Sequence, residues 1–111
     1  MVKGELRITP KQQIDFLVKL YYNQLPFSKR SINLVKDIMI NENNHNYVLR
    51  GKTGLVGDGV IPKIGWYVGY LERKNDVYFF AINQDVVKQP DDLKSRITIT
   101  KRILGDMGLL K

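Results

Sequence analysis

Apolar residues recur at helical spacing near the start of the chain. One predicted helix face follows the i, i+3, i+4, i+7 pattern and carries Ile14, Leu17, Val18 and Tyr21. Thr9 precedes this face as a candidate N-cap, Pro10 suits the first helical position, and Gln12 completes a capping box. The residue before a proline disfavours helical backbone, so the pattern predicts a helix that begins after Thr9 and ends at Leu25-Pro26.

A second apolar stripe follows Ser28, which is a candidate N-cap for another helix. Its predicted inward positions are Ile32, Val35, Ile38 and Met39. The polar run from Asn41 to Asn46 then shows no periodicity and has a strong turn propensity. We therefore expect a loop over residues 41–46.

The pattern becomes extended after this loop. Stretches rich in aromatic and β-branched residues predict three strands, over residues 47–53, 65–71 and 77–83. A turn is predicted at Gly57-Asp58-Gly59, and the short polar stretch of residues 72–76 joins the last two strands. Connections this short favour antiparallel neighbours.

A final helix is predicted to begin near Asp91, because acidic residues suit a helix start, and to stop at Gly108. Its inner stripe is predicted to hold Leu93, Ile97, Thr100, Leu104 and Met107. Segregated helices and strands indicate an α+β fold, with an antiparallel sheet of about three strands flanked by helices. Strands that are apolar on both faces need more cover than the helices supply, and at least one sheet edge stays open. The pattern therefore indicates a missing partner.

Composition narrows the possible chemistry. The 111 residues fit one domain of ordinary globular composition, 43% hydrophobic and 26% charged. There is no cysteine and a single histidine, His45, which excludes disulfides, thiolate metal sites, cysteine nucleophiles and histidine-rich metal sites. We expect no metal and no cofactor.

The net charge of +7, from 18 basic and 11 acidic residues, raises the question of nucleic-acid binding. Basic residues that bind phosphate usually cluster, whereas the densest groups here are the scattered pairs Lys29-Arg30, Arg73-Lys74 and Lys101-Arg102. The scatter favours solvated faces, or a surface that meets an acidic partner. We expect no nucleic acid as a partner.

Hydropathy gives no sign of a membrane. No apolar run approaches the roughly 18 residues of a membrane span, and the first ten residues hold no signal-peptide hydrophobic segment. As written, the sequence predicts no membrane partner and a cytoplasmic location.

The tripeptide Lys52-Thr53-Gly54 is the motif with chemical content. Together with Gly51 it looks like the end of a phosphate-binding loop. That motif needs a glycine at position 46, where Asn46 stands, and a helix after the threonine, which the glycine-rich stretch at 54–59 cannot easily start. A nucleotide-binding role is therefore disfavoured. In penicillin-recognising serine enzymes the same tripeptide lies on a strand at the edge of the active site. An exposed turn is the remaining interpretation of so short a motif.

Five segments in register extend this motif into a family pattern. They are residues 4–9 (GELRIT), 12–17 (QQIDFL), 52–54 (KTG), 65–70 (GWYVGY) and 77–83 (VYFFAIN). Together they resemble the C-terminal half of class D β-lactamases, the oxacillinases, a pattern that penicillin-sensor domains share. The resemblance covers residues 1–111 and implies an incomplete serine β-lactamase or transpeptidase-like fold. It also implies a family that is periplasmic or secreted and is linked to antibiotic resistance.

The resemblance implies substrate-binding roles at five positions. Lys52 and Thr53 match the family's residues that contact the β-lactam carboxylate, and Gly54 leaves room for substrate along the strand. Leu55 matches the position whose backbone N–H donates to the oxyanion hole. Arg96 matches the arginine that clamps the carboxylate, although without the family it would be a solvated surface arginine. The implied ligand is a β-lactam or a peptidoglycan-like carboxylate.

The family's acylating residues are not among these 111. The serines are Ser28, Ser31 and Ser95, and none is followed three residues later by lysine, as Ser-x-x-Lys requires, or two residues later by valine. No Tyr-Gly-Asn is present, and Met1 stands where the family has a tryptophan. Hydrolysis needs an activated nucleophile, so we expect a truncated and hydrolytically inactive chain unless another polypeptide complements it.

Two further interpretations stay open. The partner that covers the open sheet edge is either a missing N-terminal half or a second copy of the chain in a homo-oligomer. Alternatively, residues 1–111 form a non-catalytic interaction or penicillin-sensor-type module that self-associates or binds another protein.

Overall fold

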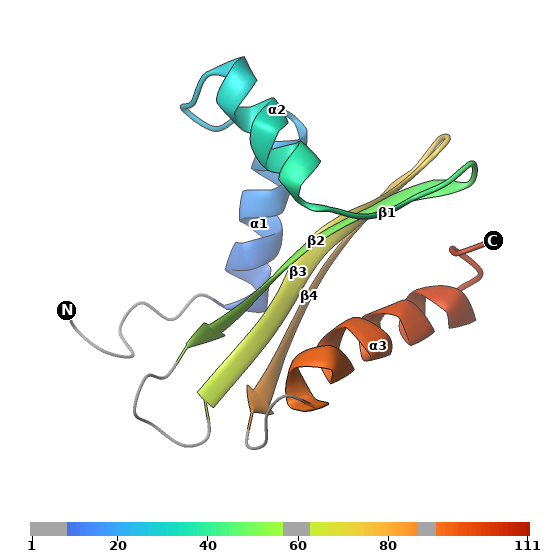
Figure 1. The fold of residues 1–111 in the computed structure, drawn as a ribbon. Helices are drawn as coiled ribbons and strands as arrows, with labels where there is room; N and C mark the ends of the chain where they lie inside the picture. The colour runs from blue at the N-terminus through green and yellow to red at the C-terminus, as the bar shows by residue number, and fades with distance from the viewer. Residues whose placement is uncertain (1–8, 57–62, 87–90) are drawn as a thin grey trace.

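Figure 1 shows a four-stranded sheet with two helices on one face and one on the other, in a computed structural model that describes residues 9–56, 63–86 and 91–111. The elements in chain order are α1 (Pro10–Tyr21), α2 (Lys29–Ile38), β1 (Ile40–Asn43), β2 (Tyr47–Val56), β3 (Lys63–Arg73), β4 (Val77–Val86) and α3 (Asp91–Asp106). The strands lie in the order β1-β2-β3-β4, and every neighbouring pair is antiparallel. The predicted α+β fold with a helix-flanked antiparallel sheet is confirmed.

Local capping sets the starts of α1 and α2, as the sequence predicts. Thr9 Oγ1 accepts a hydrogen bond from Gln12 N at 3.1 Å, and the Gln12 side chain accepts one from Thr9 N at 2.9 Å. Ser28 Oγ accepts a hydrogen bond from Ser31 N at 3.1 Å. These bonds satisfy backbone N–H groups that the first turn of a helix leaves without intrahelical partners.

The end of α1 differs from the prediction. The helix stops at Tyr21 rather than at Leu25-Pro26, because Asn23 adopts left-handed backbone with a φ of 59°. Asparagine tolerates this conformation better than most residues do, so the chain leaves the helix before it reaches the proline.

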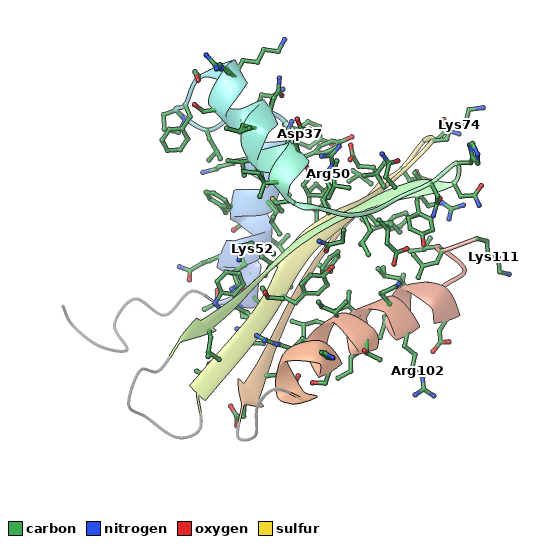
Figure 2. All side chains as sticks on the ribbon, viewed as in Figure 1. Asp37, Arg50, Lys52, Lys74, Arg102 and Lys111 are labelled. Atoms are coloured by element: carbon green, nitrogen blue, oxygen red, sulfur yellow. The ribbon has the colours of Figure 1, made fainter. Side chains whose placement is uncertain are left out.

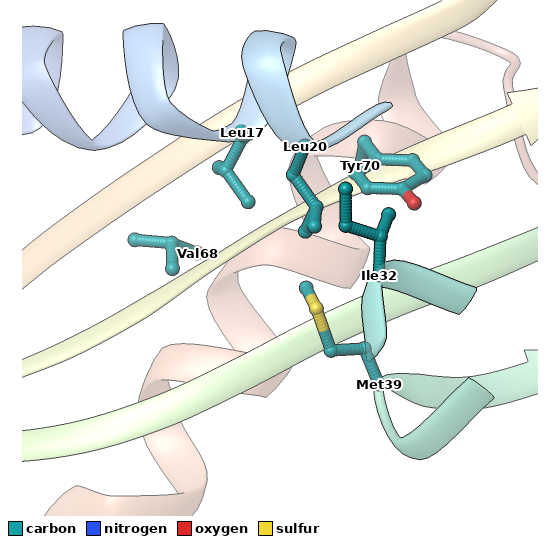
Figure 3. Packing of buried hydrophobic residues seen from close by; sticks show 6 residues of the cluster. All are labelled: Leu17, Leu20, Ile32, Met39, Val68 and Tyr70. Carbon is teal, nitrogen blue, oxygen red and sulfur yellow. The ribbon is translucent and has the colours of Figure 1, made fainter. Parts of the chain in front are cut away.

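The sheet carries a separate apolar core on each face. On the α1 and α2 side the core holds Leu17, Leu20, Ile32, Met39, Val68 and Tyr70 (Figure 3). On the α3 side it holds Tyr47, Leu49, Leu71 and Leu104. Side chains alternate along a strand, so Tyr70 and Leu71, both fully buried, point to opposite faces and each serves one core.

Helical periodicity predicts too wide a buried face for α2. Val35 is 44% exposed and Ile38 is 69% exposed, so the expectation that they point inward is wrong. The helix reaches the core only through Ile32 and through Met39 at its C-cap. Two residues seven positions apart form a narrow stripe, and side chains further round the helix stay outside it.

The last helix, α3, covers the opposite face and begins at Asp91, as predicted. The predicted stop at Gly108 agrees with its left-handed backbone, with a φ of 78°. Met107 is 60% exposed, contrary to prediction, because α3 already ends at Asp106 and the chain leaves the helical face. The predicted inner positions that are buried or half-buried are Ile97, Thr100 and Leu104, while the Leu93 side chain lies outside the described residues.

A fourth strand, β1, occupies part of the predicted loop. Residues 40–43 pair with β2, and only residues 44–46 form a connection. Polar side chains hold β1 in place, since Tyr47 Oη donates to Glu42 Oε2 at 2.6 Å and Lys101 of α3 forms an ion pair with Glu42 Oε1. The loop prediction is therefore wrong for residues 41–43. β1 is held by contacts with distant residues and its own sequence has no apolar alternation, so no local pattern indicates a strand there.

The three predicted strands are all present and are longer than the sequence pattern indicates. The predicted turn at residues 57–59 lies outside the described residues. No helix in the described part of the chain is long and apolar enough to span a bilayer.

The ion pair between Glu42 of β1 and Lys101 of α3 makes the free energy of unfolding depend on pH. Lys101 and the Tyr47 hydroxyl hold the pKa of Glu42 below its ordinary value of 4.5. A carboxyl whose pKa is lowered by folding stabilises the fold above its unfolded pKa, and that stability is lost as the pH falls through the folded pKa. We expect Glu42→Gln to lower the free energy of unfolding by about 0.5 kcal/mol at pH 7, as for a partly exposed ion pair, and to have a smaller effect at pH 3, where more of the carboxyl is protonated. Urea unfolding of both proteins at both pH values measures this. Equal effects at the two pH values would contradict it.

Candidate functional site

The Lys52-Thr53-Gly54 motif lies where β2 runs past the end of β1. β1 pairs with β2 only as far as Arg50, and Gly51 N then donates to Met39 O at 2.8 Å. From Lys52 onward, β3 is the neighbour of β2 within the described residues. The motif therefore lies in a strand and not in an exposed turn, and among residues 9–56, 63–86 and 91–111 the side of β2 away from β3 is an open sheet edge.

Backbone groups of the motif alternate between this open edge and β3. Because the Gly51 N–H points toward β1, the N–H and C=O groups of Thr53 and Leu55 point to the same side, away from β3. The open edge thus presents the Leu55 N–H, the group that the family resemblance assigns to the oxyanion hole. The Leu55 side chain is 40% exposed.

Lys52 brings a positive charge to this edge. Its side chain is exposed, and its Nζ donates to Thr53 O at 2.8 Å. The two ion pairs among the described residues, Arg50–Glu72 and Lys101–Glu42, do not involve it. Figure 2 shows Lys52 apart from Lys74 and from the last residue of the chain, which lie toward the other end of the sheet. The ammonium is placed to attract an anion that approaches the edge.

Packing against a neighbouring strand explains why residue 54 is a glycine. It lies opposite Trp66 of β3, and a Cβ at this position would lie 1.9 Å from Cζ2 of the Trp66 ring. The indole therefore crosses the strand over Gly54. The predicted role of Gly54 in making room for substrate stays a prediction.

Arg96 reaches the same strand from α3. Its side chain is fully buried, and its Nη1 donates to Gly54 O at 2.8 Å and to Trp66 O at 3.2 Å. One turn later, buried Thr100 donates from Oγ1 to Arg96 O at 2.8 Å. The interpretation as a solvated surface arginine is wrong, because Arg96 lies against the backbone of the motif. Its predicted role as a carboxylate clamp stays a prediction.

The structure thus brings all five predicted residues together at one end of β2 and β3. From the sequence, Trp66 is interpreted as a core-packing residue and Tyr67 receives no role. The structure places them opposite Gly54 and Thr53, where they shape the edge. A signal for the contact between Trp66 and Gly54 was available, since a glycine inside a predicted strand often marks a place where another group approaches closely.

Other parts of the described chain offer less chemistry. Two shallow hollows of about 300 and 440 Å³ lie around His45, Arg73 and Lys74, next to the turns at the far end of the sheet. The described residues contain no group of three or more histidine, aspartate or glutamate side chains that could hold a metal ion. The Lys52 edge is therefore the candidate site.

Known proteins resemble this chain over most of its length. The family model described as penicillin binding protein transpeptidase domain matches residues 2–105. β-Lactamase OXA-48 from Klebsiella pneumoniae is 46% identical over 101 residues, which are 91% of this chain. β-Lactamase OXA-3 from Pseudomonas aeruginosa is 45% identical over 109 residues, which are 98% of this chain.

Two solved structures share both sequence and fold. The class D β-lactamase YbXI from Nostoc is 56% identical and superposes on 96% of this chain with a TM-score of 0.87. The class D β-lactamase FUS-1 (OXA-85) from Fusobacterium nucleatum subsp. polymorphum is 34% identical and superposes on 99% of this chain with a TM-score of 0.89.

The match covers only part of each relative. The chain spans 37% and 38% of the length of the two curated relatives, and 44% and 45% of the two solved chains. Within that part the sequence, the family model and the fold all agree. The chain therefore belongs to the penicillin-binding protein transpeptidase family, together with the class D β-lactamases.

Proposed function

We propose that this chain supplies the β-lactam-binding edge of a class D serine β-lactamase. The observation that carries the proposal is the position of Lys52, an exposed ammonium on the part of β2 that extends past β1. A β-lactam carries a carboxylate, and hydrogen bonds between an ammonium and a carboxylate are stronger than neutral ones. The Thr53 hydroxyl is the second donor in this assignment.

The same edge supports the transition state of acyl transfer. When a nucleophile attacks the β-lactam carbonyl, negative charge develops on the carbonyl oxygen, and a fixed backbone N–H stabilises it. Leu55 offers such an N–H on the open side of β2. Beneath it, the buried Arg96 guanidinium holds Gly54 O and adds positive charge close to the motif.

The nucleophile is proposed to come from another segment. In acylation a serine Oγ bonds to the carbonyl carbon, the β-lactam C–N bond breaks, and the ring nitrogen takes a proton. None of Ser28, Ser31 and Ser95 belongs to a Ser-x-x-Lys pair. The 111-residue chain is therefore expected to bind but not to turn over β-lactams until a segment with that pair joins it.

A complementation experiment tests the proposal. The chain is mixed with a separately expressed polypeptide that carries Ser-x-x-Lys, taken from the part of the Nostoc β-lactamase that this chain does not span. Covalent labelling by a fluorescent penicillin is then followed over time. We expect no labelling of the chain alone and labelling in the mixture. Lys52→Ala is expected to slow labelling about 10- to 100-fold, since a charge-assisted hydrogen bond contributes roughly 1.5–3 kcal/mol.

Lys74→Ala is the matched control, because Lys74 is an exposed lysine away from the motif. It is expected to change the labelling rate less than twofold. Turnover by the chain alone, or equal labelling with Lys52→Ala and wild type, would refute the proposal. If the two polypeptides coelute on gel filtration and no labelling forms, a non-catalytic interaction module takes its place.

A further inference from the structure

The start of the substrate-binding edge is held by a polar network that begins at a bulge in β1. Ile40 pairs with Arg50 and Glu42 with Leu49, so Asn41 is an extra residue in the ladder. A β-bulge changes the direction of a side chain, and such bulges are common beside active sites. The bulge turns Asn41 toward the sheet, where its Nδ2 donates to Gly51 O at 3.4 Å.

The second part of the network is Tyr67 of β3. Its hydroxyl donates to Asn41 Oδ1 at 2.6 Å, and its ring passes beside Gly51, where a Cβ would lie 2.5 Å from Cε1. Tyr67 is 1% exposed and lies opposite Thr53 in the β2–β3 register. Burial raises the pKa of Tyr67 to about 12, so its hydroxyl stays a hydrogen-bond donor at ordinary pH.

These contacts close a ring around one residue. Gly51 N donates to Met39 O, Gly51 O accepts from Asn41, Asn41 accepts from Tyr67, and the Tyr67 ring lies beside Gly51. Gly51 directly precedes Lys52, and it is the last residue before β2 loses β1 as a neighbour. The ring therefore fixes the point from which the open edge projects.

We propose that Asn41 and Tyr67 are positioning residues, which set the direction of the Lys52–Leu55 edge through the backbone of Gly51. The inference rests on the proposed function where it concerns β-lactams. A misplacement of about 1 Å at a reacting group can slow a reaction roughly 100-fold. A short polar strand with a bulge at this one position is suited to prevent such misplacement.

The test compares two tyrosines that make equivalent bonds to β1. Tyr67→Phe removes the hydroxyl bond to Asn41, and the control Tyr47→Phe removes the 2.6 Å hydroxyl bond to Glu42, farther from Lys52 along β2. Backbone amide NMR of the full 111-residue chain is recorded for both. We expect Tyr67→Phe to shift the amide signals of residues 51–55 and to speed Gly51 amide exchange about tenfold. Tyr47→Phe is expected to leave these signals near wild type.

The penicillin-labelling mixture provides the second measurement. We expect Tyr67→Phe to lower the labelling rate at saturating penicillin about tenfold, while the half-saturating concentration changes less than threefold, because the binding groups remain but are misaligned. Asn41→Ala removes both bonds of the amide and should act in the same way. If the Asn41→Ala protein does not fold, the result for Tyr67→Phe by itself tests the positioning role.

The outcomes separate the two ideas. Amide changes that are equal in Tyr67→Phe and Tyr47→Phe, or a wild-type labelling rate in Tyr67→Phe, would overturn the positioning role. If the amide changes occur as expected and the wild-type mixture is never labelled, the proposed β-lactam function fails, and the positioning of the edge by Asn41 and Tyr67 is supported.

Discussion

Replacing Gly69 by alanine is expected to destabilise the chain by about 3 kcal/mol or more, a large part of the 5–15 kcal/mol that stabilises a typical domain. A Cβ at this position would lie 1.9 Å from Arg50 O and 2.7 Å from the Cα of Gly51. Both atoms belong to the backbone of β2, so no side-chain rotation relieves the clash. β2 and β3 must move apart at the centre of the sheet, opposite Gly51 and just before the Lys52–Leu55 edge.

Urea unfolding followed by circular dichroism measures this effect, with Gly105→Ala as the control. Gly105 lies in α3, and a Cβ there would meet only Leu110 Cδ1, at 4.0 Å. Alanine has a higher helix propensity than glycine, so this variant is expected to gain up to about 1 kcal/mol. A Gly69→Ala protein within 1 kcal/mol of wild type would show that the strands are not packed as closely as the structure has them.

Arg96→Ala is expected to cost about 3 kcal/mol of stability, independently of any ligand. The side chain is fully buried and donates from Nη1 to Gly54 O and Trp66 O. Hydrogen bonds from a charged group contribute roughly 1.5–3 kcal/mol, and removal of a long buried side chain also leaves a cavity. The motif strand would lose its support from α3.

Arg102→Ala is the matched control, because Arg102 is an exposed arginine on the same helix. A surface substitution of this kind is expected to stay within about 0.5 kcal/mol of wild type. Chemical unfolding of the three proteins without β-lactam is sufficient for the comparison. If Arg96→Ala also unfolds like wild type, the burial of Arg96 and its hydrogen bonds to Gly54 O and Trp66 O contribute nothing to the stability of the fold.

Features that depend on neighbouring residues could be predicted from the sequence. The caps at Thr9 and Ser28 are correct because each bond closes within three residues. The strands are found because their aromatic and β-branched stretches are continuous. The prediction for β1 fails because Glu42 is held by Lys101, which is 59 residues away in the chain. Helical periodicity also does not reveal how wide a face of the helix is buried. Val35 has the spacing of an inward residue but is exposed.

The residues of the candidate site also fall into those that a local sequence pattern reveals and those that only the folded structure reveals. Lys52, Thr53 and Gly54 could be found because they form a linear motif. The burial of Arg96 and its contact with Gly54 depend on how α3 crosses the sheet, and no local pattern encodes that crossing. The contact between Asn41 and Tyr67 requires both a bulge and the β2–β3 register, so it becomes visible only in three dimensions.

The open part of β2 also bears on solubility. A strand with unpaired N–H and C=O groups can pair with a strand of another molecule, which is a common route to aggregation. Proteins often guard such edges with a lysine, since pairing would bring two like charges together. Lys52 stands at this position, so the charge suited to attract a carboxylate also discourages strands of identical chains from adding to the sheet. One side chain can thus keep the edge accessible to a small anion and closed to polymerisation.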